Sequence, residues 1–238
     1  MAGHSKWSQI KRKKAALDSK RGQAFTKLIK EITVCARDGG GDPDGNARLR
    51  LLMEKAKEIN MPQENTMRAI KRGTGELPGV HYEQITYEGY GPGNIAVVID
   101  TLTDNKNRTV AEFRHLFTAK GGRLAESGSV SWMFEKLGVI RTLAGDKTED
   151  DLLEALIEYD VTDIKKEDNT LVVLCDIKGM EAIKNALKDM NLQIESAELE
   201  WIPKNSMSLP EGESDKAYDF LSAIQDHDDV KNVYTNLS

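Results

Sequence analysis

The chain has 238 residues, of which 39% are hydrophobic and 30% charged, and its formal net charge is −6. This length allows one large domain or two to three small ones, and the composition is that of an ordinary soluble protein. No apolar run approaches the roughly 18 residues of a membrane span, and no apolar segment follows the early positive charges, so we expect a cytoplasmic protein without a membrane partner.

Charge is divided unevenly along the chain. Residues 1–75 carry 17 Lys and Arg against 8 Asp and Glu, a net of +9, whereas residues 76–238 carry 16 against 31, a net of −15. The densest basic run, Lys11-Arg12-Lys13-Lys14, lies in a helix expected over residues 8–17. Because a cationic module on an acidic body is attracted to polyanions in one orientation, this polarity predicts a nucleic-acid-binding protein.

Three more helices are expected in the first third of the chain. The first repeats apolar residues at the spacing of a core-facing stripe and stops at Gly39. The second covers residues 46–58, and the third begins at Pro62, which suits a first helical turn. In this third helix Met67 and Ile70 are expected to face the core. The cations off that face are Arg68, Lys71 and Arg72. Together these helices indicate a small helical module.

Beyond a short linker, the hydrophobic period changes from 3.6 to 2. The elements expected up to residue 125 are strands over 82–88 and 94–102, a helix over 106–120 and a short strand near 123–125. The glycine-rich segment 89–93 precedes a strand rather than a helix and lacks a Gly-Lys-Ser/Thr sequence, so it indicates a hairpin turn and not a phosphate loop. The strands and the helix expected up to residue 125 therefore make up half of a small sheet domain.

The rest of the chain alternates strands and helices. The expected elements are strands over 130–134 continuing through 139–142, 161–165, 170–176 and 193–202, with helices over 148–159 and 178–190. This βαββαβ order is the split unit of ferredoxin-like folds. A last helix over 215–225 and strand over 230–234 cannot form a domain alone, so they are expected to complete the earlier half-built sheet, which makes the βαββαβ unit an insertion.

No catalytic constellation is evident. The four histidines fall in separate segments without metal-ligand spacing, and His115, between Phe113 and Phe117, is expected to be a half-buried structural residue. Cys35 and Cys175 lie in apolar patterns, so we expect buried free thiols. We therefore predict a protein that is not an enzyme, with no metal, no cofactor and no small-molecule substrate.

The candidate nucleic-acid contacts fall into two sets. The N-terminal set is Lys6, Trp7, Lys11, Arg12, Lys13, Lys14, Lys20, Arg21, Lys27 and Lys30. The Trp7 ring either stacks on a base or staples the first helix to the core. The second set, Asn105, Lys106 and Arg108, crowds a helix start that suits a backbone phosphate, although capping by Asp104 or Asn105 explains part of it. No helix-turn-helix pair with a polar recognition face is apparent.

Several segments together resemble one family end to end. They are MAGHSKW (1–7), KRGQAFTKLIKEITVCAR (20–37), GGGDP (39–43), NARLR (46–50), NMP (60–62), AIKRGTG (69–75), YEGYGPG (87–93), TDNKNRT (103–109), GSVSWMF (128–134) and DDVKNVYTN (228–236). On these motifs the chain is identified as similar to the YebC/PmpR family, whose eukaryotic relatives include a mitochondrial translational activator of cytochrome oxidase subunit I.

The resemblance implies an α+β fold of three domains: an N-terminal helical domain followed by two ferredoxin-like α/β-sandwich domains, one inserted in the other. On this sequence the expected domains are residues 1–78, which are basic and bind nucleic acid, residues 79–128 plus 205–238, and the inserted residues 129–204. The oligomeric state is not fixed by the sequence, and we expect a monomer.

The resemblance also implies a non-enzymatic regulator of gene expression, but with two targets. Many members are called probable transcriptional regulators that bind promoter DNA, and this is the function we predict. Others resemble translation factors that act at the ribosome, including on stalling at proline-rich stretches, so ribosomal RNA is the alternative partner. A third hypothesis is an interaction scaffold whose helical domain binds an acidic protein.

Overall fold

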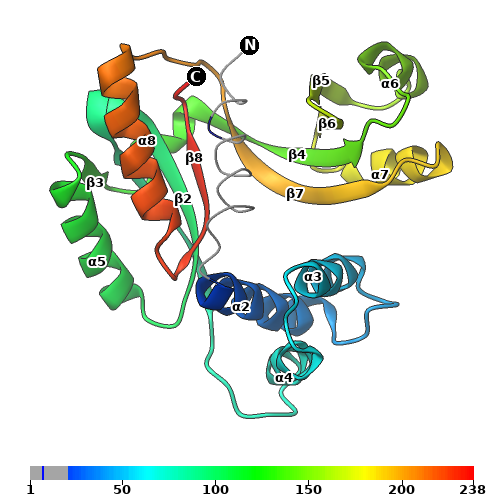
Figure 1. Cartoon of the computed structure of the whole chain (residues 1–238), viewed down its shortest axis with the longest axis horizontal. Coiled ribbons are helices and arrows are strands. Elements are labelled where there is room, and N and C mark those ends of the chain that lie inside the picture. The colour runs from blue at the N-terminus through cyan, green and yellow to red at the C-terminus, as the bar shows by residue number, and fades with distance from the viewer. Residues whose placement is uncertain (1–6, 8–20) are drawn as a thin grey trace. The chain divides into compact units, whose positions relative to one another are not determined.

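The computed structural model describes Trp7 and residues 21–238, except for the side chain of Arg21. The predicted helix over 8–17 lies outside these residues. The chain divides into two compact units (Figure 1): one runs to Ser131 and resumes over Ser206–Ser238, and the other is Trp132–Asn205. In the described part of the chain, no helix combines the length and the apolar character that crossing a bilayer requires.

A helical module opens the first unit. Its described helices are α2 (Arg21–Gly39), α3 (Ala47–Glu58) and α4 (Gln63–Gly73). Their shared core contains the predicted stripe of α2, including Leu28, Ile32 and Ala36, packed on Leu49 and Leu52 of α3. Close packing of α4 on α2 depends on a glycine, because a Cβ at position 73 would lie 2.3 Å from the carbonyl oxygen of Thr33.

The inward face of α4 differs from the one we expected. Ile70 is buried as predicted, but Met67 is 40% exposed, so its expected place in the core was wrong. Thr66 and Ala69 are buried instead. With Gly73 they complete the i, i+3, i+4, i+7 stripe that faces α2. Arg68, Lys71 and Arg72 therefore lie on the outward side of the helix.

An antiparallel sheet completes the first unit. Its strands are β1 (Glu83–Tyr90), β2 (Ala96–Thr103), β3 (Arg123–Ala125) and β8 (Val230–Thr235), in the order β3-β1-β2-β8. The predicted glycine-rich hairpin is confirmed: β1 pairs with β2 up to Tyr90 and Ala96, and the turn holds a short 3-10 helix, η1 (Pro92–Asn94). The tail completes this sheet, because β8 pairs with β2.

Helices α5 (Lys106–Ala119) and α8 (Glu211–Gln225) cover this sheet (Figure 1). Their apolar residues, among them Phe113, Phe117 and Phe220, share one core with Ile95, Val97 and Ile99 of the β2 region. Phe117 and Phe220 meet edge to face, with ring centroids 5.0 Å apart. Phe113 and Phe117 therefore face inward from α5.

The second unit has its own antiparallel sheet. Its elements are β4 (Phe134–Leu143), α6 (Glu149–Ala155), β5 (Val161–Glu167), β6 (Thr170–Cys175), α7 (Met180–Asp189) and β7 (Ile194–Pro203), with the strand order β5-β6-β4-β7. The βαββαβ order is the one predicted for the ferredoxin-like insertion. The fold is therefore α+β, with a helical module and two four-stranded antiparallel sheets; the first sheet follows the order ββαβ and then αβ.

One strand boundary was wrong for a reason that lies far away in the sequence. The strand expected from residue 130 begins at Phe134, after a short 3-10 helix, η2 (Ser131–Met133). The buried carboxylate of Glu88, on β1, accepts hydrogen bonds from the backbone N–H groups of Gly128, Val130 and Ser131. Burial alone would raise the pKa of Glu88, but these hydrogen bonds lower it below its ordinary value. Amides held by a carboxylate cannot also join a strand ladder.

Candidate functional site

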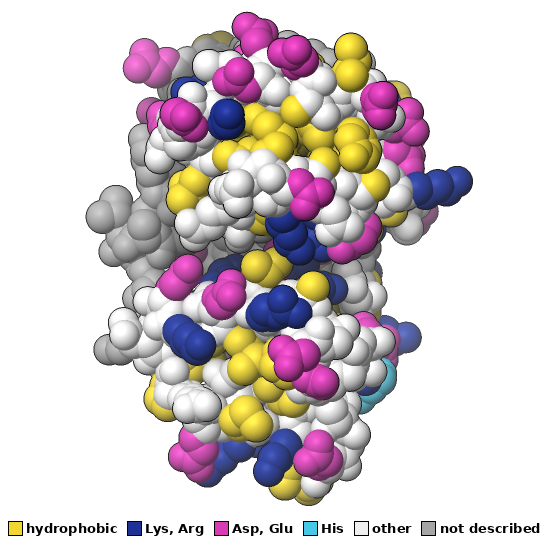
Figure 2. All heavy atoms as spheres, turned by 90° about the vertical axis from the view of Figure 1, so that its right-hand side faces the viewer, with side chains coloured by type: hydrophobic (Ala, Val, Ile, Leu, Met, Phe, Trp, Pro, Cys, Tyr) yellow, Lys and Arg dark blue, Asp and Glu magenta, His cyan; other side chains and the backbone are white. Residues whose placement is uncertain are grey.

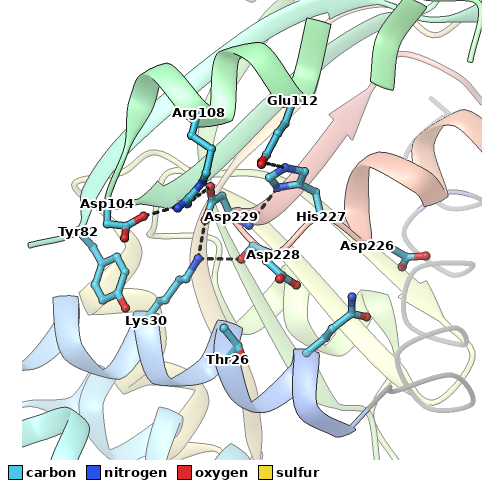
Figure 3. A pocket seen from close by; sticks show the side chains of 11 residues that line it. Thr26, Lys30, Tyr82, Asp104, Arg108, Glu112, Asp226, His227, Asp228 and Asp229 are labelled. Atoms are coloured by element: carbon cyan, nitrogen blue, oxygen red, sulfur yellow. Dashed lines mark hydrogen bonds and ion pairs between the residues drawn. The ribbon is translucent and has the colours of Figure 1, made fainter. Parts of the chain in front are cut away.

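A buried carboxylate joins the helical module to the sheet of the first unit. Asp229, in the turn between α8 and β8, has a side chain only 2% exposed. The ammonium of Lys30, on α2, lies 2.6 Å from its Oδ1, and the guanidinium of Arg108, on α5, lies 2.9 Å from its Oδ2. The hydroxyl of Thr109 donates to the same Oδ2 at 2.8 Å. We call Lys30, Arg108, Thr109 and Asp229 the Asp229 cluster (Figure 3).

The start of α5 aims its cation at this carboxylate. Asn105 is the N-cap, and its side chain accepts the backbone N–H of Arg108 at 3.1 Å, which confirms the predicted capping. Asp104, the other candidate cap, instead accepts from the Arg108 guanidinium at 2.9 Å. Arg108 is therefore held between two carboxylates, although its side chain is still 43% exposed.

The charges of the Asp229 cluster stabilise the ionised carboxylate. Burial by itself would raise the pKa of Asp229. The hydrogen bonds from Lys30, Arg108 and Thr109 outweigh that effect and hold the pKa well below its ordinary value. Lys30 has a side chain only 10% exposed, so each buried charge depends on the other for compensation. The cluster therefore connects the helical module to the sheet of the first unit.

A hollow of about 480 Å³ lies beside the Asp229 cluster (Figure 3). Its lining residues are Gln23, Thr26, Lys30, Tyr82, Asp104, Arg108, Glu112, Asp226, His227, Asp228 and Asp229. Five of these carry carboxylates, and the cations Lys30 and Arg108 are already paired with two of them. A phosphate here would face more negative than positive charge. The hollow thus offers little to a nucleic-acid backbone.

His227 is the structural histidine of this region, a role that we had expected of His115. Its Nε2 lies 2.8 Å from a carboxylate oxygen of Glu112, its Nδ1 accepts the backbone N–H of Asp229 at 3.1 Å, and its ring packs edge-on against Phe113. His115 itself is exposed, so its predicted half-burial was wrong. Spacing gave no hint of this, because His227 and Glu112 are 115 positions apart.

The same neighbourhood brings three metal-ligating side chains together. One ligand atom from each of Glu112, His227 and Asp229 lies within 4.8 Å of the others. Both oxygens of Asp229, however, already accept from side chains of the Asp229 cluster. A divalent cation would have to displace Lys30 and Arg108, whose positive charges already neutralise this carboxylate. We assign no metal to this group.

The structure distributes the predicted contact residues unevenly. Lys6, Lys11, Arg12, Lys13, Lys14, Lys20 and the side chain of Arg21 lie outside the described residues. Lys30 and Arg108 belong to the Asp229 cluster, and Lys27 donates to the carbonyl oxygen of Gln225. Lys106 is exposed, and among the described residues its side chain has no ion pair. Of the second predicted set, Lys106 is therefore the cation that remains available to a ligand.

Trp7 packs into the core, as in the second of the two alternatives considered for it, and does not lie free to stack on a base. Its ring is 5% exposed in the core of the first unit, its Nε1 donates to the carbonyl oxygen of Val233 at 3.1 Å, and it stacks with Tyr218 at a centroid distance of 6.5 Å. A ring packed in this way has no free face for a base. In this structure Trp7 anchors the chain to the core.

The contact prediction left out exposed cations on α3 and α4. On α4, Arg68, Lys71 and Arg72 share the outward side, and Arg68 pairs with Glu64 one turn earlier. On α3, Lys55 and Lys57 are exposed. Lys55, Lys57 and Lys71 make no side-chain ion pair within the described part of the chain. Their signal in the sequence was the position of Arg68, Lys71 and Arg72 off the apolar face.

The fold and the Asp229 cluster define a class of α+β protein. A helical module with exposed cations is joined through a buried ion pair to an antiparallel sheet, and the chain forms a second unit with a sheet of its own. The chain matches the TACO1/YebC protein N-terminal domain over residues 5–76 and the TACO1/YebC second and third domain over residues 82–237. It belongs to the TACO1/YebC family.

Curated relatives and a solved structure agree with this membership. Proteins described as "Probable transcriptional regulatory protein" are 52% identical in Chloroherpeton thalassium and 51% identical in Prosthecochloris aestuarii, each over all of this chain and 95% of the relative. The one from Desulfosudis oleivorans is 49% identical, with 97% of the relative covered. The crystal structure of a conserved hypothetical protein from Aquifex aeolicus matches with a TM-score of 0.82 and 40% identity, over 93% of this chain and 91% of that one.

Proposed function

We propose that this protein is a non-enzymatic, DNA-binding regulator of transcription whose basic helical domain, residues 1–78, contacts the nucleic acid. The observation that carries the proposal is the outward side of α4, where Arg68, Lys71 and Arg72 are exposed in a module whose first 75 residues have a net charge of +9. Lys and Arg that contact phosphates release condensed counterions, and this supplies most of the affinity for DNA. The description of the relatives as probable transcriptional regulatory proteins supports transcription as the process.

The proposed contact residues come from α4, from the start of α5 and from the N-terminal basic run of the sequence. They are the cations of α4, Lys106, and the residues Lys6, Lys11, Arg12, Lys13, Lys14, Lys20 and Arg21 that the sequence predicts. Lys27, Lys30, Arg108, Asn105 and Trp7 are left to structural roles. The acidic remainder of the chain repels the polyanion and so favours one orientation of binding.

Ribosomal RNA is the second candidate target. The exposed cations of α4 are Lys and Arg side chains suited to phosphates, and such contacts carry no base sequence information. Proteins recognise double-stranded RNA largely by shape and by backbone contacts, so the same surface fits an RNA helix. This reading makes the protein a translation factor at the ribosome.

Crosslinking in cells is expected to distinguish these targets. After ultraviolet and formaldehyde crosslinking, we expect the purified protein to carry discrete promoter DNA fragments, with little RNA, because sequence-selective regulators concentrate at few sites. The measurement is the ratio of co-purified DNA to RNA, with both pools sequenced. Predominantly ribosomal RNA would overturn the transcriptional proposal and establish the ribosomal one.

Reversing the charges of α4 should weaken nucleic-acid binding. In the Arg68→Glu/Lys71→Glu/Arg72→Glu variant, each lost phosphate contact is expected to reduce the slope of log K against log salt by about 0.9. Together these losses should lower affinity by roughly 10- to 1,000-fold at physiological salt. Fluorescence anisotropy with a labelled duplex at several salt concentrations measures both quantities.

A matched control reverses three other exposed lysines. The Lys166→Glu/Lys178→Glu/Lys188→Glu variant changes the net charge by the same amount, but its substitutions lie in the second unit. We expect it to bind with nearly unchanged affinity. Equal losses in both triple variants would mean that net charge alone sets the affinity and that α4 is not a contact surface.

A further inference from the structure

The outward side of α6 and its following turn exposes large apolar side chains. Leu153 is 50% exposed, Ile157 80% and Tyr159 37%, whereas Leu152 and Leu156 are buried in the core of the second unit. Leu153 lies on α6 and Ile157 in the turn after it, and each directly follows a buried leucine, so both project to the outside of the second unit's core. Single exposed apolar side chains are common on protein surfaces, but several exposed together mark an interaction site.

Carboxylates line this apolar row. Asp150, Glu154 and Glu158 repeat at four-residue intervals beside it, and all three are exposed. Residues 146–160 contain seven Asp and Glu against a single Lys. Within the part of the chain that the structure describes, these three carboxylates have no ion-pair partner. In the upper half of Figure 2, over the second unit, hydrophobic side chains gather with Asp and Glu around them.

We propose that this surface, made of Leu153, Ile157 and Tyr159 with Asp150, Glu154 and Glu158, docks a basic, amphipathic segment of another protein. We call it the α6 surface. Apolar residues of the segment would cover the row of Leu153 and Ile157, and its Lys or Arg residues would meet the carboxylates. Amphipathic helices dock in this way, with apolar anchors at i, i+3 or i+4 and charges at the rim.

Charge decides between the possible occupants. Nucleic acid and anionic lipid are repelled by a surface with this excess of carboxylates. A symmetric contact with a second copy would bring the two acidic rims together, because a two-fold interface places the same patch on both sides. A cationic protein segment is the occupant that neutralises the rim and buries the apolar row. The α6 surface therefore gives the protein a second partner, of opposite charge to the one proposed for the helical domain.

A synthetic peptide tests the α6 surface directly. The probe is a fluorescein-labelled, 18-residue amphipathic helix of Leu and Lys, and its counterpart has Glu in place of every Lys. By anisotropy, the full chain is expected to bind the Lys peptide and not the Glu peptide. The Leu153→Ser/Ile157→Ser variant should bind the Lys peptide at least 10-fold more weakly. The Glu154→Gln/Glu158→Gln variant should bind more weakly and with a smaller salt dependence.

Two matched variants separate this site from general affinity for acidic proteins. Ile177→Ser removes a side chain that is 45% exposed in the same unit but outside α6, and Glu135→Gln/Asp189→Asn removes two exposed carboxylates elsewhere in that unit. Both are expected to bind the Lys peptide as the wild type does. Circular dichroism verifies that every variant is folded.

Several results would overturn the proposal. One is a wild-type chain that binds both peptides equally; another is an α6 variant that binds as tightly as the wild type, or a matched variant that loses as much affinity. Sedimentation equilibrium adds an independent outcome: self-association that Leu153→Ser/Ile157→Ser abolishes would make a second copy the occupant. None of these results depends on nucleic-acid binding, so this proposal and the proposed function fail separately.

Discussion

Replacing Asp229 with alanine is expected to lower the free energy of unfolding of the first unit by about 3–5 kcal/mol, the range for removing one partner of a buried ion pair. Lys30, whose side chain is 10% exposed, would keep its charge without a counterion, and Thr109 would lose one of its acceptor groups, keeping the carbonyl oxygen of Asn105. Typical domains are stable by about 5–15 kcal/mol, so such a loss would leave a marginal fold. Urea unfolding followed by Trp7 fluorescence in a Trp132→Phe/Trp201→Phe background measures it, because Trp7 lies in the core of this unit.

The neighbouring carboxylate supplies the control. Asp228 is exposed, and only its backbone carbonyl takes part in the contact with Lys30, so Asp228→Ala should change stability by less than about 0.5 kcal/mol. Combining Asp229→Asn with Lys30→Met removes both buried charges and should recover much of the loss. A small effect of Asp229→Ala would show that the stability of the first unit does not depend on the Asp229 cluster.

Lowering the pH should destabilise the first unit by protonating the same carboxylate, Asp229. Because the pKa of Asp229 is held below its ordinary value in the folded state, its stabilising contribution is complete above the unfolded value of about 3.9 and is lost as the pH falls below it. The wild-type first unit should therefore lose stability progressively below about pH 4 to 5. The Asp229→Asn variant should show a flatter acid limb in urea unfolding at pH 3 to 7.

Much of the fold was predictable because its elements follow local rules. The stripe of Leu28, Ile32 and Ala36 identified α2, and the βαββαβ order of the second unit followed from its alternating strand and helix patterns. The errors came from long-range partners. The strand expected at residue 130 gives way to η2 because Glu88, about forty positions earlier, binds the backbone amides there. Met67 is exposed because the face of α4 that packs on α2 is the stripe that ends at Gly73, and Met67 does not belong to it.

The candidate site was harder to predict than the fold. Lys30 and Arg108 were expected to contact nucleic acid because sequence shows the charge of a residue but not its partner. Their partner Asp229 is 199 positions from Lys30 and 121 from Arg108, distances over which no local pattern operates. The place of Trp7 was equally hidden from the sequence, since its hydrogen-bond partner Val233 is 226 positions away. The outward position of the α4 cations could be predicted from the sequence, because it depends on the local apolar pattern of the helix and not on a distant partner.

Reversing the N-terminal basic run should have the largest effect on nucleic-acid binding. The variant Lys11→Glu/Arg12→Glu/Lys13→Glu/Lys14→Glu replaces four positive charges by four negative ones in the densest basic stretch of the sequence. If these residues contact phosphates, the slope of log K against log salt should fall by about 3.6, and affinity should drop by two or more orders of magnitude. Anisotropy with labelled duplex DNA and with a labelled RNA helix, each from low to high salt, gives both slopes.

The matched control keeps the charge and changes only its chemistry. In the Lys11→Arg/Lys13→Arg/Lys14→Arg variant the run remains fully cationic, so the salt slope should stay close to that of the wild type. A thermal melt of both variants separates loss of contact from loss of fold. An unchanged slope in the Glu variant would remove this run from the interface and leave α4 as its centre. A parallel fall in both slopes would establish an electrostatic contact common to DNA and RNA, and the crosslinked nucleic acid would then identify the physiological target.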